Sequence, residues 1–246
     1  MTTLSAAGRL LAIVKRAGQM NIQTNVYATW AQVFDMPQDQ RASVYQAIAG
    51  LHRLIDQAKD EVRSHSELRQ DLYLGALDNI ETAVSAAQFH VNWGSYVGQF
   101  QGPNLIALEF VAEQFDRLSS EEVIEASVLG ELRKEIERVI EEVLHSAIDK
   151  ELRDTLISRL EEARHAILFY QLDGADGLRR ATEGAIGAMV VVREAATSER
   201  GKAPVKSFLA ILNLLLDVVA KAKPYAALAK PAIRALLSPG PGPDAS

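Results

Sequence analysis

The chain of 246 residues contains no cysteine, which excludes disulfides, thiolate metal sites and a cysteine nucleophile. Three common catalytic signatures are also missing: Gly-x-Ser-x-Gly, the phosphate-binding Gly-Lys-Ser/Thr loop and the dinucleotide-binding Gly-x-Gly-x-x-Gly. Serine, histidine and aspartate residues occur without a spacing that indicates a catalytic triad. The sequence therefore predicts a protein that is not an enzyme and that uses no cofactor and no metal.

A secretion signal and a membrane-spanning run are missing as well. The first basic residues, Arg9, Lys15 and Arg16, lie within or after the first apolar run, whereas a signal peptide carries them before it. The most apolar run, 207–220, has 14 residues and includes two polar ones, which is short of the ~20 apolar residues that span a bilayer. We therefore expect a cytoplasmic protein.

The charge is unevenly distributed along the chain. The net charge of −6 argues against a general nucleic-acid-binding protein. The segment 200–237 nevertheless contains seven Lys and Arg residues and one acid, Asp217, so it carries +6 and leaves −12 on the rest of the chain. Such an asymmetry bears on partners and says nothing about the fold.

Apolar residues recur three and four positions apart almost throughout, and convincing strand alternation is absent. We therefore expect an all-α bundle of about nine or ten helices with no sheet. The predicted helices cover 4–17, 25–35, 39–63, 67–100, 104–117, 120–148, 150–170, 176–195, 205–223 and 225–237. Met36-Pro37 and Gly102-Pro103 mark two helix ends, and Asp173-Gly174 marks a third. Expected N-terminal caps are a capping box from Ser119 to Glu122, Asp149 and Asp176.

The predicted helix ends and the charge distribution together predict four parts of the chain. They are an acidic body over 1–196, a linker over 197–204, a basic apolar segment over 205–237 and a disordered tail over 238–246. Within the body, residues 131–150 align without gaps to residues 151–170. At ~100° per residue, a shift of 20 residues turns the apolar stripe by roughly 200°, so one straight helix would expose one of the two stripes. We therefore expect a helical hairpin at 120–170 that breaks near Asp149.

The two aligned segments each contain a Glu-x-x-His motif, Glu142 with His145 and Glu162 with His165. Pairs of this motif bind metal in di-iron helical bundles, where both side chains point into the bundle. At ~100° per residue, all four side chains here lie far from the apolar stripe of their helix. We therefore interpret them as part of a solvated acidic face.

The stretch 88–102 is rich in aromatic and small residues, and Trp93, Tyr96 and Phe100 follow helical spacing. Such a stripe is typical of a buried aromatic core. The glycines interspersed with it keep a second interpretation open, in which these three aromatic residues form an interaction site for a partner.

The segment 205–223 is predicted to be a helix with a narrow polar strip formed by Lys206, Asn213, Asp217 and Lys221. Apolar residues occupy nearly all the rest of its surface, so it must be covered by something. The cover can be the protein's own core, a second copy or partner, or an anionic membrane. The candidate contact residues on this helix are Phe208, Leu212, Leu215 and Val219.

These observations favour a non-enzymatic protein–protein interaction module, acting as an adaptor, an assembly subunit or a regulatory partner. The expected partner is another protein or a second copy of the chain, and nucleic acid is not expected. The alternative is a membrane-active effector of the toxin or defence type, which makes peripheral membrane contact by releasing its apolar, basic C-terminal helix.

Overall fold

The computed structural model describes residues 4–86, 88–119, 121–188 and 202–222. These residues form nine α-helices and contain no strand, which confirms the all-α prediction. By its backbone contacts the chain divides into two compact units. The first unit contains the described residues up to 119 together with 171–173, and the second contains 121–170 and 174–222.

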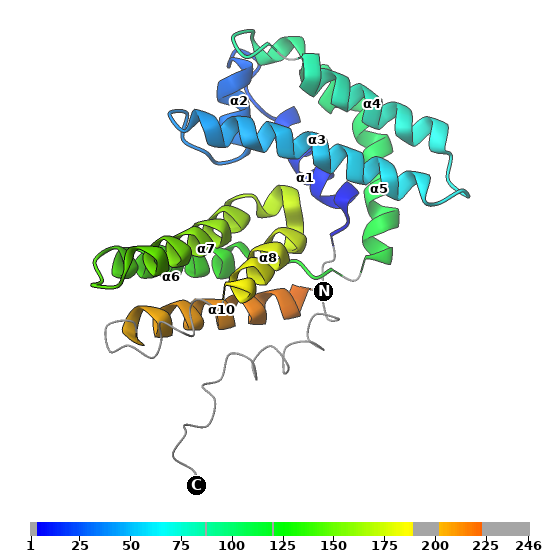
Figure 1. Ribbon diagram of the computed structural model, residues 1–246. Coiled ribbons are helices and arrows are strands. Elements are labelled where there is room, and N and C mark those ends of the chain that lie inside the picture. The colour runs from blue at the N-terminus through cyan, green and yellow to red at the C-terminus, as the bar shows by residue number, and fades with distance from the viewer. Residues whose placement is uncertain (1–3, 87, 120, 189–201, 223–246) are drawn as a thin grey trace. The chain divides into compact units, whose positions relative to one another are not determined.

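The first unit is built from five α-helices and two short 3-10 turns. Helix α1 packs against α3 and α5, and α3 packs against α4. Figure 1 shows α3 and α4 as an antiparallel pair connected by a short loop. The elements are α1 (Ala6–Gly18), α2 (Val26–Val33), α3 (Arg41–Arg63), α4 (Gln70–Ala86), η1 (Trp93–Ser95), η2 (Val97–Phe100) and α5 (Gly102–Leu118).

The start of α1 is fixed by a chain of hydrogen bonds. The Ser5 hydroxyl accepts from the Gly8 N–H at 2.9 Å, as an N-cap does, and it donates to Asp116 of α5 at 2.8 Å. The Ser5 N–H also donates to Asp116, at 2.7 Å. A Cβ atom at Gly8 would lie 2.3 Å from this carboxylate, so the close approach of α1 and α5 requires glycine there.

The predicted helix over 67–100 is wrong beyond residue 86. From residue 88 onward the chain instead runs beside the segment that precedes α2. The Val26 N–H donates to the Val91 carbonyl at 2.9 Å, the Trp93 N–H to the Thr24 carbonyl at 2.8 Å, and the Gly94 N–H to the Ile22 carbonyl at 2.9 Å. These long-range bonds replace helical ones and pair backbone donors and acceptors of the two segments.

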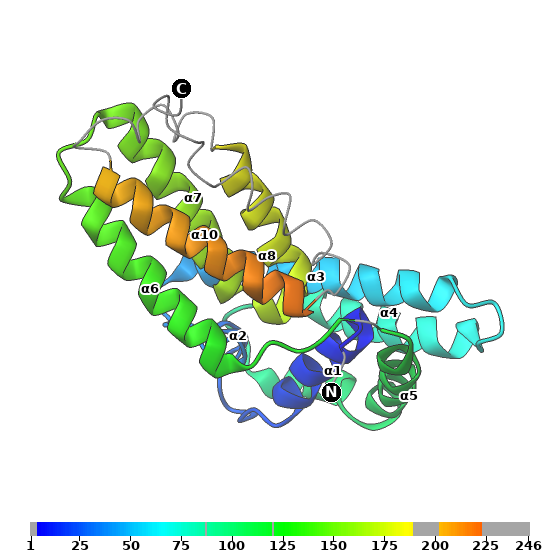
Figure 2. The same cartoon turned by 90° about the horizontal axis from the view of Figure 1, so that it is seen from below.

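The described residues of the second unit include four helices around one hydrophobic core, which contains residues from all four of them. Figure 2 shows α10 lying between α6 and α8. The helices are α6 (Ala126–Leu144), α7 (Lys150–Leu168), α8 (Tyr170–Gly187) and α10 (Lys202–Ala222). Helices α6 and α7 form the predicted hairpin, and Asp149 caps α7 as expected by accepting from the Leu152 N–H at 2.9 Å.

Two of the predicted caps do not form. Ser119 ends α5, with its N–H donating to the Phe115 carbonyl, and α6 begins only at Ala126. Asp176 lies inside α8, where its carboxylate accepts from Arg179. The expected turn at Gly174 is present as a kink with φ of 59°, but α8 continues on both sides of it.

The boundary between the two units lies near residue 120, within the segment predicted as the acidic body. Helix α10 shares its core with α6, α7 and α8, because its apolar face completes the hydrophobic cluster of these helices. Residues 202–204 of the predicted linker form the first turn of α10. The rest of the linker, the end of the helix predicted at 176–195, the predicted helix 225–237 and the tail 238–246 lie outside the described residues.

Candidate interaction surface

The four residues of the Glu-x-x-His motifs face away from the core, as predicted. Glu142 accepts from the Ser207 hydroxyl at 2.9 Å, and His145 is exposed. Glu162 pairs with Arg159 at 2.7 Å, while His165 stacks on the Phe169 ring. Among the described residues, no group of three or more His, Cys, Asp or Glu side chains could hold a metal ion.

One buried lysine connects two helices of the first unit. Lys59 of α3 reaches Asp78 at 2.6 Å and Glu81 at 2.5 Å, both on α4. Burial lowers the pKa of Lys59, but the hydrogen bonds with Asp78 and Glu81 outweigh it and raise the pKa above its ordinary value. The ammonium group therefore stays charged at neutral pH, so it fits an ion-pair role and not that of a general base.

A partly buried group, Glu61 of α3, binds the start of α1. Its carboxylate accepts from the backbone N–H groups of Ala6 at 2.8 Å and Ala7 at 3.0 Å. Burial raises the pKa of Glu61, although these two hydrogen bonds and the charge of Arg9 oppose the shift. Because the carboxylate satisfies donors at a helix N-terminus, its geometry fits a structural contact between α1 and α3.

The predicted aromatic contact residues divide into two groups. Trp93 and Phe100 are fully buried beside Trp30, and the Trp93 indole N–H donates to the Ala17 carbonyl at 2.9 Å. This placement agrees with the core interpretation, although the stretch is not a helix. Tyr96 is partly exposed, and its hydroxyl accepts from the Gln88 N–H at 3.2 Å.

The predicted contact residues of α10, namely Phe208, Leu212, Leu215 and Val219, are all buried in the core of the second unit. Within the described part of the chain, α10 alone is long and apolar enough to cross a membrane, with a mean hydropathy of 1.7. Half of that apolar window is buried inside the protein, and a core helix of a soluble protein passes the same test. In this structure the cover of these four side chains is the chain's own core.

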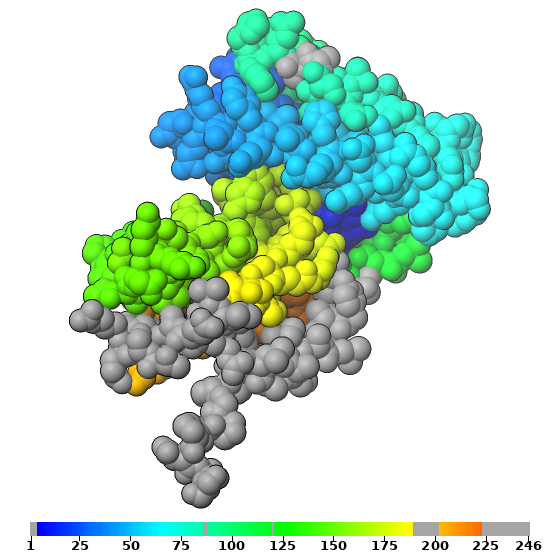
Figure 3. Space-filling view, viewed as in Figure 1, coloured from blue at the N-terminus to red at the C-terminus, as the bar shows by residue number. Residues whose placement is uncertain are grey.

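Three exposed apolar side chains lie on α5 and α4 of the first unit. Phe110 is 60% exposed, Ile106 is 53% exposed and Leu72 is 49% exposed. Tyr73 lies next to Leu72 and is partly exposed. We call these four residues the α4–α5 surface. In the space-filling view, the atoms of α4 are in the cyan part of the first unit and green atoms of α5 lie below them (Figure 3).

Helix α5 is apolar on two opposite sides. Its inner side buries Leu108, Val111 and Phe115 against the first unit. At ~100° per residue, Ile106 lies about 170° and Phe110 about 130° from the centre of that inner side. A helix that is apolar on both sides is expected to be covered on both sides, because solvated helix faces are normally polar.

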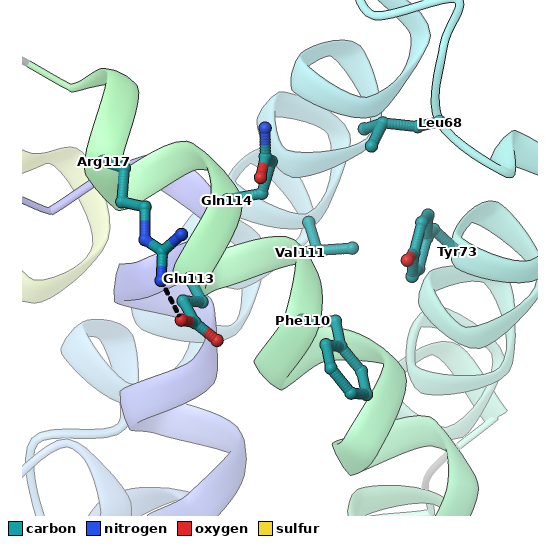
Figure 4. Close-up of a pocket in the computed structure, with 7 residues that line it drawn as sticks. All are labelled: Leu68, Tyr73, Phe110, Val111, Glu113, Gln114 and Arg117. Atoms are coloured by element: carbon teal, nitrogen blue, oxygen red, sulfur yellow. Dashed lines mark hydrogen bonds and ion pairs between the residues drawn. The ribbon is translucent and has the colours of Figure 1, made fainter.

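A pocket of about 180 Å³ opens between α5 and the start of α4. Figure 4 shows Leu68 and Tyr73 on one side and Phe110 and Val111 on the other. Small-molecule sites enclose roughly 300–1,000 Å³, so this pocket fits one apolar side chain of a partner better than a substrate. It is lined by Leu68, Tyr73, Phe110, Val111, Glu113, Gln114 and Arg117.

The rim of the α4–α5 surface carries both signs of charge. On α5, Arg117 pairs with Glu113 next to the pocket (Figure 4). On the α4 side, Arg69 lies 3.9 Å from Asp71. Along the chain, Arg69 follows the pocket residue Leu68, and Asp71 precedes the surface residue Leu72. The rim is therefore close to neutral, which favours neither a polyanion nor a strongly basic partner.

A smaller aromatic cluster lies elsewhere in the first unit. The rings of Tyr27, Tyr45 and Phe89 have centroids 5.2–6.3 Å apart, and Tyr45 and Phe89 are partly exposed. Their edge-to-face and tilted contacts mean that much of each ring is already used within the cluster. It therefore offers less free apolar area to a partner than Phe110 does.

Sequence reasoning missed the α4–α5 surface, although a signal for it exists. Ile106 and Phe110 are four residues apart, and they face away from the apolar positions Leu108, Val111 and Phe115 of the same helix. The surface offers contact area and a side-chain pocket, and among the described residues it brings together no catalytic constellation. Comparison with family models, with curated proteins and with solved structures gives no match for this chain.

Proposed function

We propose that the chain is a non-enzymatic helical protein–protein interaction module that binds its partner through the α4–α5 surface. The observation that carries the proposal is the second apolar side of α5, where Ile106 and Phe110 are more than half exposed. Isolated exposed apolar residues are common on soluble proteins, but adjacent ones beside a side-chain pocket are typical of interfaces.

The energetics of this surface suit a partner with an apolar centre. Fully burying a Phe, Ile or Leu side chain contributes up to about 1.5–3 kcal/mol each, and Phe110, Ile106 and Leu72 are still available for burial. Aromatic residues at the centre of an interface and charged residues at its rim are the common arrangement. Phe110 and Tyr73, with Glu113 and Arg117 beside the pocket, fit that arrangement.

A site-specific crosslinking experiment tests this function. A photo-crosslinking amino acid replaces Phe110 in the full chain, which is expressed in its native cells and irradiated. We expect discrete adducts with defined partners, because the side chain would lie at the centre of the contact. The matched control places the same group at Leu144, which is 47% exposed on α6. Equal adduct patterns at both positions would remove the α4–α5 surface as the binding site.

A further inference from the structure

The stripe of exposed side chains along α5 has an unequal composition. Its first half presents Ile106 and Phe110, which are apolar, and its second half presents Glu113, Gln114 and Arg117. A partner that covers the apolar half must be apolar there, and it must tolerate both signs of charge at its edges. A second copy of the same surface meets both requirements.

Other occupants fit the charge of the rim less well. Anionic lipid and nucleic acid need an excess of Lys and Arg, whereas the rim pairs Arg69 with Asp71 and Arg117 with Glu113. The chain's own segment 223–246 contains three basic residues and one acid, so it would favour an acidic groove. A near-neutral rim with both signs is complementary to itself.

We propose that the partner on the α4–α5 surface is a second copy of this chain, bound by antiparallel contact of the two α5 helices. This inference rests on the proposed function and names its partner. A twofold axis near Leu108 places Ile106 of each copy against Phe110 of the other copy. The contact is isologous, so the same two residues are used twice.

The charges of α5 are compatible with this register. When Ile106 faces Phe110, position 113 faces position 103, so Glu113 is opposite Pro103 of the other copy. Glu109 is already paired with Lys15 of its own copy at 2.8 Å. Leu72 and Tyr73 of α4 extend the contact beside the α5 pair. The register thus buries the apolar half of the stripe and leaves the charged half at the edge.

The first test measures the mass of the full chain in solution by light scattering over a range of concentrations. We expect twice the mass of one chain, and the substitution Phe110→Glu is expected to weaken the dimer by at least about tenfold in its dissociation constant. Leu144→Glu, at a comparably exposed position on α6, is the control and is expected to leave the dimer unchanged. Circular dichroism checks that both variants keep the helical content of the parent.

The second test examines the register. Phe110→Glu and Ile106→Lys are each expected to be monomeric alone. Mixed together, they form a heterodimer in which the new Glu faces the new Lys on one side while native Ile106 still faces native Phe110 on the other. A mixture of Phe110→Glu with Phe110→Lys serves as the control, because its two new charges do not face each other in this register.

Three results would overturn the inference. They are a monomeric parent chain, a dimer that survives Phe110→Glu, and equal recovery in both mixtures. A monomeric chain that still crosslinks from position 110 to another protein would remove the self-association and keep the proposed function. Loss of both the dimer and the position-specific adducts would remove the two proposals together.

Discussion

Helices α5 and α10 deal with apolar surface in opposite ways. Helix α10 is the more apolar, yet Phe208, Leu212 and most of its other large side chains are buried in the four-helix core of the second unit. Helix α5 has a larger fraction of polar residues, yet it exposes Ile106 and Phe110 on the side away from its own core. High hydropathy in a sequence therefore identifies a core helix here, whereas the candidate site lies on a helix of ordinary composition.

The comparison shows that the number of apolar faces matters more than the total apolar content. On α10 the apolar residues form one broad face, and one set of neighbours covers it. On α5 the apolar residues form two faces about 130–170° apart, and neighbours from the first unit cover only one of them. A single core cannot bury both faces of a helix at its margin, so the second face of α5 stays exposed.

The largest expected effect tests the claim that α10 is a core helix. Phe208→Ala should reduce the free energy of unfolding by about 3–5 kcal/mol, because it removes a buried aromatic ring and leaves a cavity. Leu214→Ala, at an exposed position of the same helix, should change it by less than about 0.5 kcal/mol. Urea unfolding followed by circular dichroism measures both. Similar values for the two variants would contradict the burial of α10.

The next prediction compares the two faces of α5 by replacing one phenylalanine on each face with alanine. Phe115→Ala should lower the free energy of unfolding by about 3 kcal/mol, since Phe115 is buried and its ring packs edge-on against His65. Phe110→Ala should change it by less than about 0.5 kcal/mol under conditions in which the chain is monomeric. The same urea experiment applies at low protein concentration. An equal loss for both variants would mean that the outer face is already covered within the chain.

The smallest effect concerns pH at the inner side of α5, where Asp116 and the neighbouring Glu61 hold the start of α1. The pKa of Glu61 is raised in the folded state, mainly by burial, so the folded chain binds more protons than the unfolded chain between the ordinary and the raised pKa. Its contribution to stability therefore falls as pH rises through that window. Glu61→Gln should flatten this slope in urea midpoints measured at successive mildly acidic pH values.

Asp35 provides a control of opposite sign. Its hydrogen bond with Arg16 lowers its pKa in the folded state, so its contribution is present above the unfolded pKa and is lost as pH falls through the folded one. Asp35→Asn should therefore reduce the decrease in the free energy of unfolding that occurs as pH falls. Glu61→Gln should instead change the dependence of that free energy on pH just above the ordinary carboxyl pKa. A change of the same sign in both variants would contradict the assignment for Glu61.

The sequence predicted most of the helices because apolar periodicity and capping residues determine where these helices form and end. The break at Asp149 follows from the rotation of the apolar stripe between the two aligned segments, and its carboxylate caps α7 as expected. The outward direction of His145 and His165 follows from the same helical geometry. In these places, no distant part of the chain competes with the local pattern.

The failures occur where distant residues decide the structure. The spacing of Trp93, Tyr96 and Phe100 fits a helix, but the backbone of this stretch bonds to residues 22–26, and no local pattern reports that pairing. The α4–α5 surface was missed for a related reason. Periodicity shows that α5 has apolar residues on two sides, but only tertiary packing determines which side is left exposed.

The placement of the two tryptophans gives the chain a built-in optical label. Trp30 and Trp93 are the only tryptophans in the sequence, and their buried rings lie 5.3 Å apart in the first unit. Intrinsic fluorescence will thus follow the unfolding of the first unit alone, whereas far-ultraviolet circular dichroism sees the helices of both. A difference between the two unfolding curves would reveal the order in which the units melt, without any dye or added residue.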